Sequence, residues 1–382
     1  MTSAFPEEEF DRRLELTRER LADRGLDAGL VSSPENIFYL CGLDHWGYFA
    51  PHILVVPVTG EPVLVTRAME RVTIANQVRN VRFEGHTDSE NAAEKTVTVL
   101  RAMGLAGSRL GLEKGSAGLT PFLAEVLASG LPGARWHDVS GLVDDLRLVK
   151  SPAEQDYIRQ AAKVSDAAMR AAIDTIRDGA REAEIAAECH RAMILAGGTF
   201  PGFGPFIRPG ARLGEEHTTW GDGVIRAGAP VFLELSGCVR RYHAPMGRLV
   251  HVGPAPRESR EMETVCLKAF DAVVEALRPG VLARDVYRAW QRVVDEAGLA
   301  HYRRHHCGYL VGIGFPPTWT GGNKVTGLRH DSELEIRTGM AFHILSWLMG
   351  TGRGDYFVSN TVLLGTHGPE VLTRTPSTIT EK

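Results

Sequence analysis

A repeated unit in the second half of the chain constrains the fold more than any other feature. The segments "AIDTIRDGAREAEIAAECHRAMILAGG" and "VVEALRPGVLARDVYRAWQRVVDEAGL" each combine a helix, a glycine turn (Gly179 and Gly280), an amphipathic helix and a closing Ala-Gly pair. Strand-like sequence rich in Gly and Pro follows each segment. Two matching units, each a helix pair with a sheet, predict a pseudo-twofold domain with a ligand cleft between its halves.

The first part of the chain has a different pattern. Apolar strands alternate with turn residues in "DAGLVSSPENIFYLCGL" and "HILVVPVTGEPVLVTR", and helical stretches follow them. The two patterns meet near "DDLRLVKSPAEQDYIRQAA", where Ser151 and Glu154 form a capping box and Pro152 occupies the first helical position. We therefore predict an α/β (α+β) protein, with a small α/β domain over residues 1–145 and a larger domain over residues 146–382.

Composition excludes several classes of protein. The formal net charge is -4 and 24% of the residues are charged, which is typical neither of a nucleic-acid binder nor of a disordered chain. No run of about 18 apolar residues occurs, and the start lacks the apolar core of a signal peptide. We expect a cytoplasmic protein without membrane contact. The five cysteines form no CxxC pair, which indicates neither a disulfide framework nor a thiolate zinc site.

One predicted hairpin carries polar residues inside an apolar pattern. Residues 231–250, "VFLELSGCVRRYHAPMGRLV", are typical of two strands and a turn, yet they include Glu234, Tyr242, His243 and Arg248. A buried carboxylate is costly unless it faces a cation. Glu234 therefore either pairs with an internal cation such as Arg248 or binds a cationic ligand.

The boundary segment, the repeated unit and the ending "GMAFHILSWLMGTGRGDYFVSNTVLLGTHGPEVLT" resemble the superfamily of prolidases, aminopeptidases P and creatinases. The resemblance covers nearly the whole chain. It implies a creatinase-like N-terminal domain followed by a pseudo-twofold domain of the pita-bread fold. Most members of this superfamily are dinuclear metallopeptidases that use two Asp, one His and two Glu as ligands.

The same resemblance implies that the metal ligands are missing. The five aligned positions hold Glu234, Pro245, Ile313, Leu345 and Ser359. Pro, Ile and Leu cannot ligate a cation, and a single carboxylate does not hold two metal ions that each need several donors. We therefore expect a site with no metal and no other cofactor.

The metal-free members of the superfamily provide a matching pattern. His217 occupies the position of the catalytic histidine, which creatinase and ectoine hydrolase also keep. The segments "LELSGCVRRYHAPMGR", "CGYLVGIGFPPTW" and "GMAFHILSWLM" resemble the ectoine hydrolase branch, whereas creatinase has a carboxylate at the place of Gly247. The resemblance implies a metal-independent hydrolase that opens a C–N bond of a cyclic amidine, as in the conversion of ectoine to N-acetyl-2,4-diaminobutyrate. A creatinase-like amidinohydrolase acting on a guanidino acid and a catalytically inactive binding protein are the alternatives.

Roles for individual residues follow from the chemistry of such a substrate, which carries an amidinium and a carboxylate. Glu234 is expected to pair with the amidinium, and either to position a water or to attack the amidine carbon. His217 is expected to transfer protons, because imidazole titrates near neutral pH. The substrate carboxylate is expected at one of Arg248, Arg208 and Arg212.

The resemblance implies further substrate-binding residues. They are Tyr242, His243, Arg248, His343, Tyr309, Trp46 and Tyr48. In dimeric relatives the region of Trp46 reaches the cleft of the partner subunit, which implies a homodimer. The partner ligand is expected to be a small amidine or guanidino carboxylate. Neighbouring residues of a strand point to opposite faces, so His305 and His306 are not expected to share an ion. The segment "RRHH" (303–306) is interpreted as a solvated strand edge.

Overall fold

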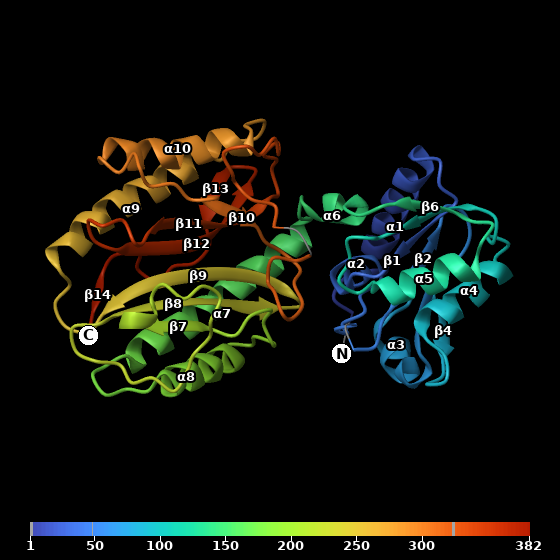
Figure 1. Ribbon diagram of the computed structural model, residues 1–382, viewed down its shortest axis with the longest axis horizontal. Helices are drawn as coiled ribbons and strands as arrows, with labels where there is room; N and C mark the ends of the chain where they lie inside the picture. The colour runs from blue at the N-terminus through green and yellow to red at the C-terminus, as the bar shows by residue number, and fades with distance from the viewer. Residues whose placement is uncertain (1–2, 48, 323–324) are drawn as a thin grey trace. The chain divides into compact units, whose positions relative to one another are not determined.

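The computed structural model describes residues 3–47, 49–322 and 325–382, and the chain divides into two compact units, Met1–Leu148 and Val149–Lys382 (Figure 1). The boundary expected from the sequence, between residues 145 and 146, lies inside helix α6 (Leu142–Arg147). Within the described ranges, none of the helices combines the length and the apolar character needed to cross a membrane.

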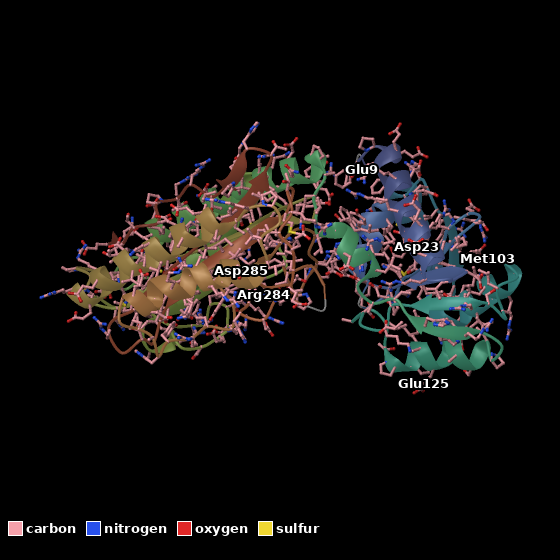
Figure 2. The ribbon with its side chains drawn as sticks, turned by 90° about the horizontal axis from the view of Figure 1, so that it is seen from above. Glu9, Asp23, Met103, Glu125, Arg284 and Asp285 are labelled. Atoms are coloured by element: carbon pink, nitrogen blue, oxygen red, sulfur yellow. The ribbon has the colours of Figure 1, made fainter. Side chains whose placement is uncertain are left out.

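The N-terminal unit is built on a six-stranded sheet in the order β4-β3-β2-β1-β5-β6. Its strands are β1 (Ala28–Val31), β2 (Ile53–Pro57), β3 (Val63–Arg67), β4 (Arg82–His86), β5 (Arg109–Leu112) and β6 (Arg135–Asp138), and its remaining helices are α1 (Glu7–Asp23), α2 (Pro34–Cys41), α3 (Arg71–Gln77), α4 (Ala92–Ala102) and α5 (Pro121–Gly130), with a short 3₁₀ turn at Ala68–Glu70. Apolar residues of β1, β2, β3 and β5 pack against α4 and α5 in one buried core. Charged residues such as Asp23 of α1 and Glu125 of α5 stay exposed on the surface of this unit (Figure 2).

The second unit combines two helix pairs with one large sheet. Its helices are α7 (Pro152–Thr175), α8 (Glu182–Leu195), α9 (Arg257–Ala276) and α10 (Ala283–Glu296), and its strands are β7 (Phe206–Pro209), β8 (Pro230–Val239), β9 (Tyr242–His251), β10 (Gly308–Leu310), β11 (Ala341–Leu348), β12 (Tyr356–Gly365), β13 (Gly368–Val371) and β14 (Thr380–Glu381), with a 3₁₀ turn at Gly210–Arg212. The helices lie outside the sheet in Figure 1, α7 and α8 along one half and α9 and α10 along the other.

The strand order of this sheet confirms the repeated unit. The order is β10-β11-β12-β9-β8-β7, so three strands follow in chain order from each edge to the centre: β10, β11 and β12 from one edge, and β7, β8 and β9 from the other. In the chain, α7 and α8 precede one set of three strands, and α9 and α10 precede the other. A pseudo-twofold axis therefore passes between β12 and β9, and the two halves meet at the centre of the sheet.

The start of α7 is anchored to the hairpin of the first half. The predicted capping box is confirmed, because the Ser151 side chain accepts from the Glu154 N–H and the Glu154 side chain accepts from the Ser151 N–H, with Pro152 in the first turn. The second carboxylate oxygen of Glu154 accepts a hydrogen bond of 2.8 Å from the Tyr242 hydroxyl on β9. One side chain thus caps the helix and fixes its position against the sheet.

The hairpin of β8 and β9 has a tight two-residue turn. Arg240 and Arg241 both adopt positive φ, 50° and 66°, as a turn of the primed type requires. Side chains alternate along the strand, so Leu233 and Leu235 enter the core beneath α7 and α8. Glu234 therefore faces the opposite side of the sheet.

Candidate active site

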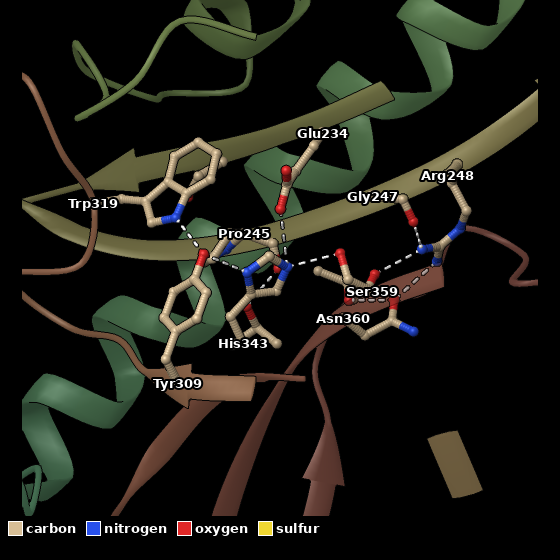
Figure 3. A network of polar contacts seen from close by, with 12 residues as sticks. Glu234, Pro245, Gly247, Arg248, Tyr309, Trp319, His343, Ser359 and Asn360 are labelled. Atoms are coloured by element: carbon tan, nitrogen blue, oxygen red, sulfur yellow. Dashed lines mark hydrogen bonds and ion pairs between the residues drawn. The ribbon is translucent and has the colours of Figure 1, made fainter. Parts of the chain in front are cut away.

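Residues far apart in the sequence form a row on the face of the sheet turned away from the helices. Glu234 is paired with Gly247, Gly247 with Ser359, and Ser359 with Leu345. Pro245 lies on the same face because it is two residues from Gly247. Four of the five positions that the superfamily resemblance aligned with metal ligands therefore meet here, as Figure 3 shows for Glu234, Pro245 and Ser359.

A chain of hydrogen bonds runs along this row. The Trp319 Nε1 is 2.9 Å from the Tyr309 hydroxyl oxygen, which is 2.8 Å from Nδ1 of His343, and Nε2 of His343 is 2.7 Å from Oγ of Ser359 (Figure 3). Since an indole nitrogen only donates, Tyr309 accepts from Trp319 and keeps its own O–H available for Nδ1 of His343. Burial holds the pKa of His343 well below the usual range, so its ring is neutral.

Glu234 is the carboxylate of the row and is 7% exposed. Its Oε1 lies 3.8 Å from Nε2 of His343, which is too far for a hydrogen bond. Burial raises the pKa of Glu234 to about 8, while Arg208 and Arg304 act in the opposite direction and Glu216 raises it further. A carboxylate in this position would be stabilised by a bound cation.

A second row lies two residues along the strands from the first. On β7, Phe206 is paired with Glu234 and Arg208 with Phe232. The rings of Phe232 and Trp347 are 5.4 Å apart, so aromatic side chains continue this row across the sheet toward β11. The site thus combines a carboxylate with an aromatic surface and a buried guanidinium.

His217 is exposed at the edge of this arrangement. Its ring packs edge-on against Phe206, with the ring centroids 6.2 Å apart, and its backbone has a φ of 53°. Since Phe206 is paired with Glu234, the structure brings the two predicted catalytic residues to neighbouring positions without a direct contact. His305 lies close enough to His217 that the two imidazoles interact electrostatically, although burial is the largest cause of the lowered pKa of His305.

Two residues predicted to bind substrate, Tyr242 and His243, form hydrogen bonds inside the protein instead. Tyr242 is fully buried and donates to Glu154. The His243 Nε2 accepts from the Gly202 N–H at 2.9 Å, which leaves Nδ1 to donate to the Arg241 carbonyl at 3.0 Å. Burial lowers the pKa of His243 to about 3, so it is a neutral residue with both nitrogens in use.

Arg248 also differs from its predicted role. It is 2% exposed, and its guanidinium donates to the carbonyls of Gly247, Ser359, Thr375 and Pro376 and to Oδ1 of Asn360. Each nitrogen of the fork has an internal acceptor, so Arg248 joins β9 to β12 and to the C-terminal segment. Its N–H groups are used inside the protein, which disfavours the expected role of Arg248 in binding a substrate carboxylate.

We expect Arg248→Met to lower the free energy of unfolding by about 3 kcal/mol or more, because several buried carbonyls lose their donor at once. Urea unfolding measures the effect, and Arg257→Met is the matched control because Arg257 is an exposed arginine that pairs with the surface residue Glu261. Unchanged stability with lost ligand affinity would show instead that Arg248 contacts the substrate.

Two further predicted residues of the second unit, Arg212 and Ile313, lie outside the row. Arg212 pairs with Glu182 at 2.6 Å and with Glu215 at 2.9 Å. Trp46 is 39% exposed and belongs to the N-terminal unit. Tyr48 lies outside the described residues. Ile313 forms a bridge with Tyr242, so its backbone lies beside the hairpin turn.

Sequence reasoning missed several residues that the structure places around Glu234. They are Trp319, Trp347, Arg304 and the hydroxyl of Ser359 as a partner of His343. In "AFHILSWL" side chains alternate between the two faces of the strand, so His343, Leu345 and Trp347 lie on one face. This alternation could have predicted that Trp347 faces the site. No comparable signal marked Arg304, which precedes β10.

The side chains of the row do not fit a dinuclear metal centre. Among the residues that the structure describes, no group of three or more His, Cys, Asp or Glu side chains could hold a metal ion. Glu234 is the only acidic side chain among the five aligned positions. His343 contributes a neutral imidazole, but both of its nitrogens are engaged by Tyr309 and Ser359.

Comparisons with known proteins agree with this architecture. Residues 156–366 match the model of metallopeptidase family M24, and residues 13–149 match the creatinase/prolidase N-terminal domain. Ectoine hydrolase of Halomonas elongata is 28% identical over 97% of this chain and 97% of its own. Xaa-Pro dipeptidase of Pyrococcus furiosus is 23% identical over 95% of this chain and 98% of its own.

The fold is matched by solved structures as well. Xaa-Pro dipeptidase from Bacillus anthracis has a TM-score of 0.85 and 20% identity, and the match covers 98% of this chain and 100% of that one. Together these matches confirm the creatinase-like N-terminal domain, the pita-bread domain and the mixed α/β class expected from the sequence.

Proposed function

Since the chain belongs to metallopeptidase family M24, a family of hydrolases, we propose that it is a hydrolase that works without metal and opens a carbon–nitrogen bond of a cyclic amidine, as ectoine hydrolase does. The observation that carries this proposal is the composition of the row on the sheet. Where the resemblance aligns five metal ligands, the chain has a single carboxylate, Glu234, beside a neutral His343 and Ser359.

A buried carboxylate without a metal suits a cationic organic ligand. An amidinium presents two N–H groups in a plane, so it pairs with a carboxylate through charge-assisted hydrogen bonds. Such a ligand would compensate for the burial that raises the pKa of Glu234. An amidine carries its positive charge at the bond that is hydrolysed, whereas the peptide bond of a dipeptide is neutral and its cation is the N-terminal ammonium, so a carboxylate at the reacting centre suits an amidine better.

The reaction requires only water and proton transfers. Water adds its oxygen to the amidine carbon, one C–N bond breaks, and the departing nitrogen takes up a proton, leaving an amide and an amine. We assign the proton transfers to His217, whose exposed ring lies next to Phe206. Glu234 either positions the water or attacks the carbon to form an intermediate that water then hydrolyses.

The geometry disfavours a creatinase-like reading of the site. Creatinase-like enzymes need a carboxylate where this chain has Gly247, but a Cβ at this position would collide with the ring of Phe357. The ring packs on Phe232, with centroids 4.8 Å apart, and cannot move without disturbing that stack. An amidine hydrolase that relies on Glu234 avoids this conflict.

A substrate screen of chelator-treated protein tests the proposal. We expect turnover of ectoine or a related cyclic amidine to an open-chain amide, with no metal at one or more equivalents per chain. Elemental analysis and product identification by mass spectrometry are the measurements, with hydroxyectoine, creatine and Xaa-Pro dipeptides as competing substrates. Metal-dependent dipeptide cleavage would overturn the proposal, urea from creatine would favour an amidinohydrolase, and binding without turnover would indicate an inactive binding protein.

A further inference from the structure

Two guanidinium groups next to Glu234 have buried N–H groups that no described residue accepts from. Arg208, on β7, is 1% exposed, and its Nε and Nη1 have no hydrogen-bond partner among the described residues. The Nε of Arg304 is buried and likewise has no partner there. Since a buried unpaired donor is costly, these groups are arranged for an acceptor that the described protein does not supply.

Both guanidinium groups are held against the same aromatic surface. The guanidinium carbon of Arg304 lies 4.7 Å from the centre of the Trp347 ring. That of Arg208 lies 4.0 Å from the centre of the Phe232 ring and 6.0 Å from that of Trp347. A guanidinium stacked on a ring keeps its N–H edge free, and this edge binds a carboxylate in a bidentate manner.

The charges around the pair point to an anionic ligand group. Arg208 and Arg304 both act electrostatically on Glu234, yet neither forms a hydrogen bond with it among the described contacts. The neighbouring Arg303 contrasts with them, because it turns to the surface and pairs with Asp295 at 2.9 Å. Glu234, Glu216 and Glu215 act on Arg208 through space, but among the described contacts no acid forms an ion pair or hydrogen bond with Arg208 or Arg304.

We propose that Arg208 and Arg304, on the surface formed by Phe232 and Trp347, bind the carboxylate of a zwitterionic substrate whose cationic end pairs with Glu234. Only the pairing of the cationic end with Glu234 rests on the proposed function; the carboxylate site does not. In this proposal Arg304 determines substrate specificity. Arg208 and Arg304, rather than Arg248, bind the substrate carboxylate. The site would then select for amidines that carry a carboxylate over simple amidines of the same ring size.

Three small probes separate the two ends of the ligand. Ectoine carries both charges, 2-methyl-1,4,5,6-tetrahydropyrimidine is the same ring without the carboxylate, and cyclohexanecarboxylate has the carboxylate without the amidinium. Calorimetric titration in the His217→Asn background measures their affinities without turnover. The variants are Arg304→Gln, Arg208→Gln and Arg208→Lys, with Arg303→Gln as the matched surface control.

We expect ectoine to bind about 10- to 100-fold more tightly than the carboxylate-free ring, the usual effect of hydrogen bonds to a charged group. Arg304→Gln and Arg208→Gln should remove this advantage and leave the affinity for the carboxylate-free ring within about threefold. Arg208→Lys keeps the charge and should restore part of the advantage. The Arg303→Gln control should change neither affinity.

The outcomes distinguish this inference from the proposed function. If the variants weaken ectoine and the carboxylate-free ring equally, or no more than Arg303→Gln does, the carboxylate site is refuted while amidine binding stands. If cyclohexanecarboxylate binds through both arginines and neither amidine binds more tightly, the carboxylate site stands and the amidine proposal fails. Absence of binding by all three probes would overturn both. Melting temperatures of each variant identify any that fail to fold, and Arg208→Lys then replaces Arg208→Gln.

Discussion

Replacing Glu234 with Gln is expected to weaken ectoine binding about 10- to 100-fold and to lower turnover at least about 100-fold. The substitution keeps the size of the side chain but removes the charge that pairs with an amidinium. The amide NH₂ of Gln would also face the N–H groups of the ligand. Turnover should fall further than affinity, because an amide neither attacks carbon nor orients water as a carboxylate does. Calorimetric affinity and steady-state kinetics on the same preparation measure both effects.

The pH dependence of this variant provides its internal control. In the free protein the pKa of Glu234 is about 8, so binding of an amidinium must displace a proton at lower pH. Wild-type affinity should therefore rise as pH increases toward 8 and then level off, whereas Glu234→Gln should show no such rise. A cyclic amidine stays cationic through this range, so the ligand itself does not add to the slope.

Glu234→Gln should make the protein more stable, whereas the loss of a structural residue would make it less stable. The folded-state pKa of Glu234 is raised, so ionisation in the unfolded chain favours unfolding increasingly as pH rises from about 4.5 to 8. Glu234→Gln removes this effect, so the difference between the melting temperature of the variant and that of the wild type should increase as pH rises from about 4.5 to 8. A variant that is less stable at every pH, with normal affinity for amidines, would show that Glu234 is an internal structural partner.

Local sequence pattern was enough to predict the framework of the site. The repeat of helix pairs, the capping box at Ser151 and the alternation around Glu234 are short-range features, and each has the structural form expected of it. Because a strand has a period of two, the buried leucines on either side of Glu234 dictate that its carboxylate faces the other side of the sheet.

Partners contributed by distant segments could not be predicted in the same way. Arg248 and Arg208 are both arginines in apolar strands, and their neighbours in the sequence do not distinguish them. The acceptors of Arg248 include the carbonyls of Thr375 and Pro376, more than a hundred residues away. The sequence "RRHH" suggests a solvated strand edge, whereas in the structure the guanidinium of Arg304 lies over the ring of Trp347 on β11.

Replacing His217 is expected to lower turnover about 100- to 10,000-fold while ectoine affinity changes little, since the proposed task of the ring is proton transfer rather than binding or packing. The ring is exposed, so its removal opens no cavity in the core. Its backbone φ of 53° introduces one complication, because Ala in this region is strained. His217→Asn avoids it, since Asn tolerates the left-handed region but cannot act as a base.

Both His217 variants should therefore be almost inactive, with melting temperatures near that of the wild type for Asn. His367→Ala is the matched control, because this exposed histidine lies in the turn between β12 and β13. If only the Ala variant lost activity, the backbone at this position would matter rather than the imidazole. The neighbouring His305 supplies the decisive comparison. Normal turnover in His217→Asn, together with loss of turnover in His305→Asn, would assign the proton transfer to His305 and refute the catalytic role of His217.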